Sequence, residues 1–156
     1  MKYYLAYGSN LNIEQMKQRC PGAKAVDTAI INGWELSFKG SKTGSYLTID
    51  KKTGGQVPVA VWAVTNECID ALDRYEGYPT FYKKHSFNVQ FINEGGWHEC
   101  FAYVMRPDAV YGIPTHYYYS ICQQGYEYFN FDENILRKAL ERSRGGRREH
   151  IQGKTS

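Results

Sequence analysis

The sequence predicts an α+β protein, a small mixed or antiparallel β-barrel flanked by short helices. Two observations point to this class. In the middle of the chain apolar and polar residues alternate, most clearly at Phe87, Val89 and Phe91, and this period of two is typical of half-buried strands. Turn sequences such as Asn93-Glu94-Gly95-Gly96 separate neighbouring segments by only a few residues. Short hairpin connections favour a barrel or mixed sheet over a doubly wound parallel sheet.

Local signals define the order of the elements. Residues 2–7 form a short apolar run typical of a buried strand. A helix is expected over residues 13–20, because Asn10 or Asn12 can cap it and Pro21-Gly22 ends it. The other strands are expected at residues 25–31, 34–39, 44–50, 57–64, 86–91 and 97–105.

Three further signals concern the middle and the end of the chain. Asn32-Gly33 is a dipeptide that favours a tight turn, so it predicts a hairpin between the strands on either side of it. Residues 57–64 are apolar on both alternating faces, which is typical of a central strand. Helices are expected near residues 115–124 and 133–143, the second with an apolar stripe along one side.

Length and composition indicate one soluble globular domain. The chain has 156 residues, of which 42% are hydrophobic and 22% charged, a balance that excludes a disordered polymer. A chain of this length buries about two-thirds of its unfolded surface, so it can enclose a pocket. No apolar run approaches the ~18 residues that span a bilayer, and the N-terminus resembles no signal peptide. We therefore expect a cytoplasmic protein without a membrane partner.

The cysteines agree with that compartment. The sequence contains no Cys-x-x-Cys pair, and a domain of this size needs no covalent staple. Buried free thiols are therefore expected at all four positions, Cys20, Cys68, Cys100 and Cys122.

The positive charge belongs to the C-terminal end. The formal net charge is +3, but residues 137–154 hold seven Lys or Arg and two Glu, so the rest of the chain carries a net charge of −2. Residues 1–144 are expected to form the domain and residues 145–156 a flexible basic tail. The basic residues raise one possible function, which is the binding of single-stranded nucleic acid through Arg144, Arg147 and Arg148. The acidic body argues against it, and no nucleic-acid partner is expected.

Glu76 breaks the pattern of its own helix. In the segment 65–78, Cys68, Ile69 and Leu72 form an apolar stripe, and Glu76 occupies the next position on that stripe. Gly77 follows where a helix takes its left-handed C-terminal residue. Burial and the negative end of the helix dipole both favour a protonated carboxyl group. Glu76 is therefore a candidate general base or acid, unless the helix unwinds before it and the side chain reaches water.

A candidate anion-binding site lies at the turn Gly8-Ser9-Asn10. A strand enters this turn and a helix leaves it, so successive backbone N–H groups can face an anion. The turn has neither a GxGxxG nor a GKS/T pattern, which excludes the usual nucleotide loops. An ordinary strand–helix turn is the alternative.

Other catalytic patterns are weak. His98 and Cys100 would point to one face of a strand, but two ligands do not make a zinc site, so no metal is expected. Ser9 has no GxSxG context, which argues against a serine hydrolase.

Three motifs in order resemble the gamma-glutamylcyclotransferase-like superfamily. The first is Tyr7-Gly8-Ser9-Asn10-Leu11, which follows a short strand. The second, within residues 71–79, is similar to that family's "LD-x-x-EG" segment, and the third, within residues 114–125, to its late "PS-x-x-Y" helix start. Together with the strand that precedes the first motif, they span residues 3–125. The fold that the resemblance implies is a small β-barrel flanked by helices.

The resemblance implies a chemistry and a set of site residues. These enzymes convert gamma-glutamyl amines or peptides to 5-oxoproline and the free amine, without a cofactor. By resemblance, Glu76 is the catalytic general base and acid, and the Tyr7–Leu11 loop binds the gamma-glutamyl group. Tyr82 and Tyr118 match pocket tyrosines of the family, although Tyr117 and Tyr119 are neighbouring candidates. The substrate-binding residues implied are Tyr7, Gly8, Ser9, Asn10, Leu11, Tyr82 and Tyr118.

An alternative keeps the same pocket without its chemistry. A small-molecule binding module would bind a gamma-glutamyl compound and never release 5-oxoproline. The sequence leaves open the identity of the leaving amine and the oligomeric state.

Overall fold

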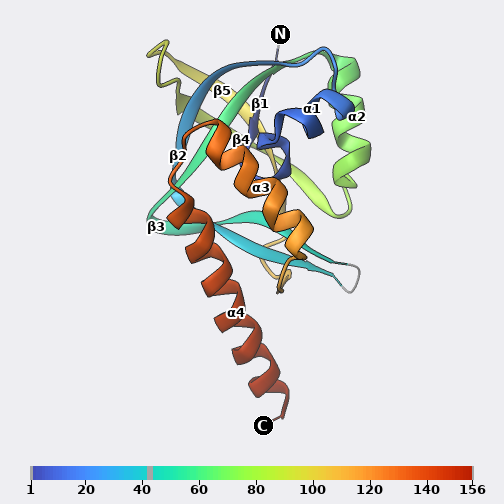
Figure 1. Cartoon of the computed structure of the whole chain (residues 1–156), viewed down its shortest axis with the longest axis vertical. Helices are drawn as coiled ribbons and strands as arrows, with labels where there is room; N and C mark the ends of the chain where they lie inside the picture. The colour runs from blue at the N-terminus through green and yellow to red at the C-terminus, as the bar shows by residue number, and fades with distance from the viewer. Residues whose placement is uncertain (1, 42–43, 156) are drawn as a thin grey trace.

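A computed structural model describes residues 2–41 and 44–155, with the backbone alone for residue 41 and residues 147–155. Within this part of the chain, six strands form one mixed sheet that curves into a half-barrel, and four α-helices accompany it (Figure 1). The predicted α+β class with a barrel-like sheet is confirmed. The elements are β1 (Lys2–Ala6), the 3-10 helix η1 (Ser9–Leu11), α1 (Ile13–Arg19), β2 (Lys24–Ser41), β3 (Gly44–Val64), α2 (Asn66–Glu76), β4 (Tyr82–Gln90), β5 (Trp97–Met105), β6 (Val110–Tyr111), α3 (His116–Tyr128) and α4 (Glu133–Thr155).

The strand order β4-β5-β1-β3-β2-β6 places β1 in the interior of the sheet. It pairs antiparallel with β3 and parallel with β5, and the other neighbouring strands pair antiparallel. Tyr4, Leu5 and Ala6 of β1 and the apolar residues of the second half of β3 are buried, as the sequence predicted for a central strand in residues 57–64. The turn that follows β1 therefore leaves the sheet from its middle. The neighbouring strands β3 and β5 fix the position of β1 on both sides.

The predicted hairpin at Asn32-Gly33 is wrong. Strand β2 continues through Gly33, which has φ 85° and lies in a bulge, and its antiparallel pairing with β3 extends as far as Ser41 opposite Gly44. The pairing shifts from Asn32 opposite Gln56 to Trp34 opposite Lys51, so four residues of β3 bulge out opposite Gly33. Asn-Gly supplies a left-handed residue here, but a bulge uses that geometry as well as a turn does.

Side-chain hydrogen bonds show which residues cap the N-termini of α1 and α2. The Asn12 side chain accepts a hydrogen bond from the Gln15 backbone N–H at 3.1 Å and caps α1. Thr65 caps α2 in the same way, through the Cys68 N–H at 3.2 Å. Satisfied N-terminal N–H groups fix where each helix begins, and α2 then runs to Glu76.

Helix α3 packs directly on η1. Gly125 lies so close to Leu11 that a Cβ atom at this glycine would collide with the Leu11 side chain and carbonyl carbon. The Asn12 amide also donates a hydrogen bond to the Gln124 side chain at 2.9 Å. The third motif of the sequence therefore holds the first one in place.

Helix α4 is longer than predicted. It begins at Glu133 as expected but continues to Thr155 instead of ending near residue 143, and it leads away from the sheet to the C-terminus (Figure 1). Its N-terminal half packs on β2, where the Ser143 hydroxyl accepts a hydrogen bond from the Phe38 N–H at 2.8 Å. The side chains of residues 147–155 lie outside the described residues, and the expected flexibility of residues 145–156 stays a prediction.

Two of the cysteines are not free thiols, contrary to the prediction. Cys20 and Cys68 form a disulfide with their Cα atoms 5.3 Å apart, whereas Cys100 and Cys122 are free and buried. The bond joins the end of α1 to the first turn of α2. Because the partners are 48 residues apart, their spacing gave no sign of the pairing. The cysteine argument for a reducing compartment therefore does not hold for this pair.

Across the described ranges, no helix is both long and apolar enough to span a membrane.

Candidate active site

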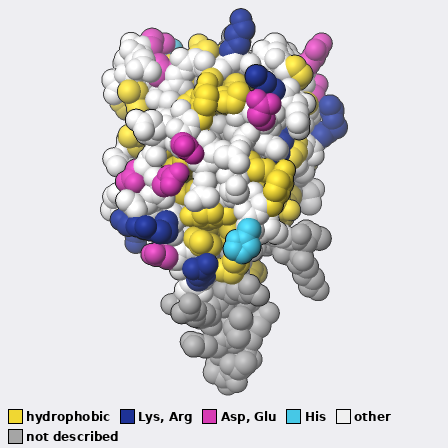
Figure 2. Space-filling view, in the orientation of Figure 1, with side chains coloured by type: hydrophobic (Ala, Val, Ile, Leu, Met, Phe, Trp, Pro, Cys, Tyr) yellow, Lys and Arg dark blue, Asp and Glu magenta, His cyan; other side chains and the backbone are white. Residues whose placement is uncertain are grey.

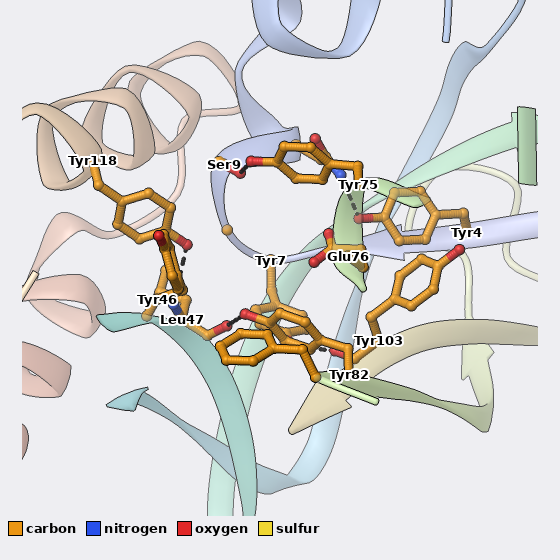
Figure 3. Close-up of a pocket in the computed structure, with 13 residues that line it drawn as sticks. Tyr4, Tyr7, Ser9, Tyr46, Leu47, Tyr75, Glu76, Tyr82, Tyr103 and Tyr118 are labelled. Atoms are coloured by element: carbon orange, nitrogen blue, oxygen red, sulfur yellow. Dashed lines mark hydrogen bonds between the residues drawn. The ribbon is translucent and has the colours of Figure 1, made fainter. Parts of the chain in front are cut away.

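Five segments from different parts of the chain enclose a cavity of about 260 Å³. They are the end of β1 with η1, the start of β3, the C-terminal end of α2 with the start of β4, the end of β5, and the first turn of α3. Figure 3 shows Glu76 in the middle of the tyrosines that surround the cavity. The described residues that line it are Tyr4, Tyr7, Gly8, Ser9, Asn10, Tyr46, Leu47, Tyr75, Glu76, Phe81, Tyr82, Tyr103 and Tyr118.

Glu76 is the last residue of α2 and faces the cavity. Gly77 follows in the left-handed conformation with φ 65° and ends the helix, as the sequence predicted. The helix does not unwind before Glu76, so the side chain is partly buried rather than solvated. Burial raises the pKa of Glu76 to about 7, and the Arg19 guanidinium limits this rise. A carboxyl group with this pKa can accept and donate a proton at neutral pH.

The turn at Gly8 faces the same cavity. The N–H groups of Leu11 and Asn12 donate to the Gly8 and Ser9 carbonyl groups, both at 3.0 Å, and so close η1. The N–H groups of Ser9 and Asn10 precede that first turn and have no acceptor within it. The two residues that carry these N–H groups line the same cavity as Glu76.

Close packing fixes the turn against α3. A Cβ atom on Gly8 would lie 3.3 Å from the Tyr118 hydroxyl oxygen and 3.4 Å from the Leu47 Cβ. The Tyr118 hydroxyl in turn accepts a hydrogen bond from the Leu47 N–H at 3.0 Å. Glycine at this position lets the turn approach the tyrosine.

Hydrogen bonds to the backbone and to Asp73 hold the buried tyrosines. Tyr82 donates to the Leu47 carbonyl at 2.7 Å, and Tyr7 donates to the Tyr103 carbonyl. Tyr103 donates to Asp73 at 2.6 Å, and Lys84 pairs with the same carboxylate at 2.9 Å. Burial raises the pKa of Tyr7 and Tyr82 well above the ordinary value, so these hydroxyls stay protonated and act as fixed dipoles.

Arg19 holds the turn and the end of α2 together from outside the cavity. Its guanidinium group contacts the Asn10 side-chain oxygen and donates to the Ser9 hydroxyl at 3.3 Å and the Tyr75 hydroxyl at 2.6 Å. The Ser9 and Tyr75 hydroxyls are 3.4 Å apart. One cation therefore orients both segments that contribute the candidate catalytic groups.

The structure brings together six of the seven substrate-binding residues that the resemblance implied. Leu11 is the exception, because it is fully buried under α3 and its N–H closes η1. Among the neighbouring tyrosines, Tyr118 faces the cavity, whereas Tyr117 is 73% exposed and Tyr119 packs against Phe38. The roles of these residues in binding stay predictions.

The sequence analysis missed several residues of this site. Tyr4, Tyr46 and Tyr103 come from three strands, and only the folded structure brings them to one cavity. Arg19 lies 56 residues from Tyr75, and no local pattern connects the two. The high tyrosine content was the one available signal for an aromatic cavity.

The His98 and Cys100 pair shows no set of metal ligands. The His98 Nε2 lies 2.8 Å from the Glu94 carboxylate, and the Cys100 thiol contacts the His98 carbonyl at 3.6 Å. Among the described residues, no group of three or more His, Cys, Asp or Glu is placed to hold a metal ion.

The family model for "gamma-glutamyl cyclotransferase, AIG2-like" matches residues 4–121. The match covers most of the chain and includes the turn, Glu76 and Tyr118. The chain therefore belongs to the gamma-glutamyl cyclotransferase, AIG2-like family, which is a family of enzymes.

A curated relative and solved structures agree with this assignment. Over 81 residues the chain is 35% identical to a gamma-glutamylcyclotransferase of Bos taurus, a match that spans 47% of this chain and 43% of the relative. A solved gamma-glutamyl cyclotransferase superposes with a TM-score of 0.78 at 26% identity, over 88% of this chain and 85% of that one. A Homo sapiens protein described as uncharacterized superposes with the same TM-score at 27% identity and the same coverage. A mouse AIG2-like protein, at 20% identity and a TM-score of 0.57 over 69% of this chain and 78% of that one, shares the fold.

Proposed function

We propose that this protein is a gamma-glutamyl cyclotransferase that converts a gamma-glutamyl amine or peptide to 5-oxoproline and the free amine. One observation carries the proposal. Glu76 and the turn residues Gly8, Ser9 and Asn10 line the same cavity, and all four lie within the segment that matches the family. A gamma-glutamyl group offers an ammonium for the carboxylate and a carbonyl oxygen for the main-chain donors.

The reaction begins with a proton transfer to Glu76. The α-amino group of the substrate has a pKa of about 8, so it is mostly protonated at neutral pH and cannot attack. Ionised Glu76, with a pKa of about 7, accepts one proton from this ammonium. The free nitrogen then attacks the γ-carbonyl carbon and closes a five-membered ring.

The second half of the reaction returns the proton. The tetrahedral intermediate carries an oxyanion, which the N–H groups of Ser9 and Asn10 stabilise; one donor of this kind contributes about 3 kcal/mol. Protonated Glu76 donates its proton to the nitrogen of the departing amine. The oxyanion collapses to the lactam carbonyl and the C–N bond to the amine breaks. The ring nitrogen, which became positively charged when it attacked, passes its extra proton to the departing amine, so 5-oxoproline and an ammonium leave and Glu76 returns to its ionised form.

The buried tyrosines contribute to the reaction by giving the cavity a fixed shape. Ring closure is intramolecular, and a site that enforces the reactive conformer gains roughly 7–11 kcal/mol from orientation. Tyr4, Tyr7 and Tyr103 are each less than a tenth exposed, and hydrogen bonds hold their hydroxyls in place. This rigid floor favours the folded conformer of the gamma-glutamyl chain.

Charge patterning supports a small-molecule substrate over nucleic acid. On the face in Figure 2, the described basic side chains lie among acidic ones instead of forming a continuous basic surface. A nucleic-acid site would need clustered Lys and Arg along a groove. The cavity beside Glu76, with a volume of about 260 Å³, has the size for a compact small molecule.

The test is the release of 5-oxoproline from gamma-glutamyl compounds, measured by mass. Wild-type protein should release it, and Glu76→Gln should lose at least 100-fold in kcat, as loss of a general base does. Glu67→Gln removes the same charge from an exposed position of α2 and is expected to keep full activity. Saturable binding without product in wild type would favour the binding module and contradict the proposal.

A further inference from the structure

The α-carboxylate of a gamma-glutamyl group needs a hydrogen-bond donor, and the tyrosine hydroxyls of the cavity differ in whether they can be one. A hydroxyl has one proton to donate and two lone pairs that accept. Where a fixed partner takes the proton, the hydroxyl can only accept from a ligand. Where a fixed partner donates to the oxygen, the proton is left for the ligand. The hydrogen bonds around the cavity therefore indicate which tyrosine can bind an anion.

Three tyrosines that line the cavity have already used their proton. Tyr7 donates to the Tyr103 carbonyl group, and Tyr82 donates to the Leu47 carbonyl group at 2.7 Å. The Tyr103 hydroxyl donates to the Asp73 carboxylate at 2.6 Å. Carbonyl groups and carboxylates only accept, so the direction of each bond is settled. These three hydroxyls present lone pairs to a ligand, which suits an ammonium group and not an anion.

Tyr4 has the opposite polarity. The Asn10 side-chain amide donates to the Tyr4 hydroxyl oxygen at 2.9 Å, and the Asn10 side-chain oxygen accepts from the Arg19 guanidinium group. A guanidinium group only donates, so the Asn10 atom that it contacts is the oxygen and the NH₂ group faces Tyr4. Among the described residues, the Tyr4 hydroxyl has no second hydrogen-bond partner, and its proton is left for a ligand.

The Tyr4 hydroxyl lies beside the candidate base. Figure 3 shows the Tyr4 ring extending from β1 toward Glu76. Burial and the nearby Glu76 charge raise the pKa of Tyr4 well above its ordinary value, so the hydroxyl keeps its proton at neutral pH. In the proposed reaction the α-ammonium of the substrate contacts Glu76. The α-carboxylate is bonded to the same carbon atom, so it lies next to the ammonium and within reach of Tyr4.

Arg19 supplies a counter-charge for this carboxylate without touching it. The hydrogen bonds run in one direction, from Arg19 to Asn10 and from Asn10 to Tyr4. Aligned hydrogen bonds polarise one another in a site that excludes water. An anion that accepts from Tyr4 is therefore stabilised by the whole chain of donors, which ends at a cation.

We propose that the Tyr4 hydroxyl binds the α-carboxylate of the gamma-glutamyl group, and that Asn10 and Arg19 are positioning residues that orient this hydroxyl. The assignment rests on the proposed function and adds the residue that selects a substrate with an α-carboxylate. The cavity should then distinguish a ligand that carries this carboxylate from one that lacks it, and the distinction should depend on one hydroxyl group.

Two lactams test the role of this hydroxyl. 5-Oxoproline is the proposed product, and 2-pyrrolidinone is the same ring without the carboxylate. At about pH 6, below the pKa of Glu76 of about 7, NMR titration of wild type should give 5-oxoproline a dissociation constant at least about tenfold lower than that of 2-pyrrolidinone. Tyr4→Phe should weaken 5-oxoproline binding by at least about tenfold, the size of a hydrogen bond to a charged group, and leave 2-pyrrolidinone binding unchanged.

The neighbouring tyrosine of the same strand provides the control. Tyr3 packs against Phe91 and His98 and does not line the cavity. Tyr3→Phe removes the same hydroxyl group one residue away from Tyr4. It should change the affinity for neither lactam.

Asn10→Asp tests the orientation of the hydroxyl while the hydroxyl itself stays in place. A carboxylate at this position still accepts from Arg19 but cannot donate to Tyr4, so the Tyr4 proton turns toward it and away from the ligand. We expect Asn10→Asp to weaken 5-oxoproline binding, and we expect Tyr4→Phe to cause no further loss in that background. Losses that multiply in the double variant would contradict the role of Asn10.

The outcomes separate this inference from the function beneath it. Unchanged 5-oxoproline binding in Tyr4→Phe would overturn the inference. An equal loss for both lactams would also overturn it, because Tyr4 would then act on the shape of the cavity or on Glu76. Neither result concerns the release of 5-oxoproline by wild type. Absence of that release would overturn the proposed function, and the titrations would still decide whether Tyr4 binds a carboxylate.

Discussion

Arg19 lies over the ring of Tyr75, with its guanidinium carbon 3.6 Å from the ring centroid. Tyr75 immediately precedes Glu76, so the contact connects α1 to the end of the helix that carries the candidate base. Arg19 also lowers the pKa of Glu76 from the higher value that burial alone would give. It is a positioning residue that acts through Tyr75, Ser9 and Glu76.

We therefore expect the pH dependence of the rate to change when Arg19 is replaced. In wild type, kcat/KM should rise with pH through about 7, the pKa of Glu76, because the ionised carboxyl group is the base in the free enzyme. Arg19→Gln removes the nearby cation, so this rise should move to higher pH. A purely structural loss would lower the activity at every pH and leave the midpoint where it was. Arg106→Gln, a change at an exposed surface arginine, serves as the control.

Glu76→Gln should stabilise the protein at alkaline pH. The folded pKa of about 7 lies above the ordinary value of 4.5, so the folded state binds more protons than the unfolded state between these two values. The contribution of Glu76 to stability is therefore present below about 4.5 and is lost as the pH rises to about 7. Relative to wild type, the variant should gain roughly 2–3 kcal/mol in the free energy of unfolding between pH 5 and pH 8. Urea denaturation at the two pH values measures this gain, and an unchanged difference would show that the carboxyl group is not buried.

Gly8 and Tyr118 should be energetically coupled. Gly8→Ala places a Cβ atom 3.3 Å from the Tyr118 hydroxyl, so we expect a loss of about 1 kcal/mol in stability. Tyr118→Phe leaves the Leu47 N–H without its acceptor, at a cost of about 1–3 kcal/mol. The double variant should lose less than the sum, by at least about 0.5 kcal/mol, because Phe makes room for the new methyl group. Strictly additive losses of stability in this double-mutant cycle, measured by denaturation, would contradict the close approach of Gly8 to Tyr118.

The disulfide predicts how many thiols react with an alkylating agent before and after reduction. Alkylation of the unfolded, unreduced chain should label Cys100 and Cys122, and all four cysteines should react after reduction. Reduction should also lower the free energy of unfolding by roughly 3–4 kcal/mol, because the bond closes a loop of 48 residues. Labelling of four thiols without a reductant, as read by mass, would contradict the bond between Cys20 and Cys68.

Local signals located the two central features of the site. The position of Glu76 follows from the spacing of Ile69 and Leu72, and its helix ends where Gly77 requires it to end. The turn at Gly8 follows from a strand and a helix on either side. Such features depend on neighbours within about four residues, so the sequence predicts them well.

Features that depend on distant partners were missed or wrong. The Asn32-Gly33 pair forms a bulge because β2 gains more pairing with β3 by continuing than by turning. Arg19 and Tyr103 reach the site only through the arrangement of α1 and β5, and the Cys20–Cys68 bond depends on the same packing. Periodicity contains no information about these tertiary contacts.

A structure of Glu76→Gln with an unreacted gamma-glutamyl amide bound would test the central claim most directly. The account predicts the α-nitrogen of the ligand within about 3.2 Å of the residue 76 side chain. It also predicts the γ-carbonyl oxygen at the N–H groups of Ser9 and Asn10, with the α-nitrogen about 3–3.5 Å from the carbonyl carbon. A ligand whose α-amino group lies away from residue 76, or whose γ-carbonyl oxygen faces away from the turn, would contradict it.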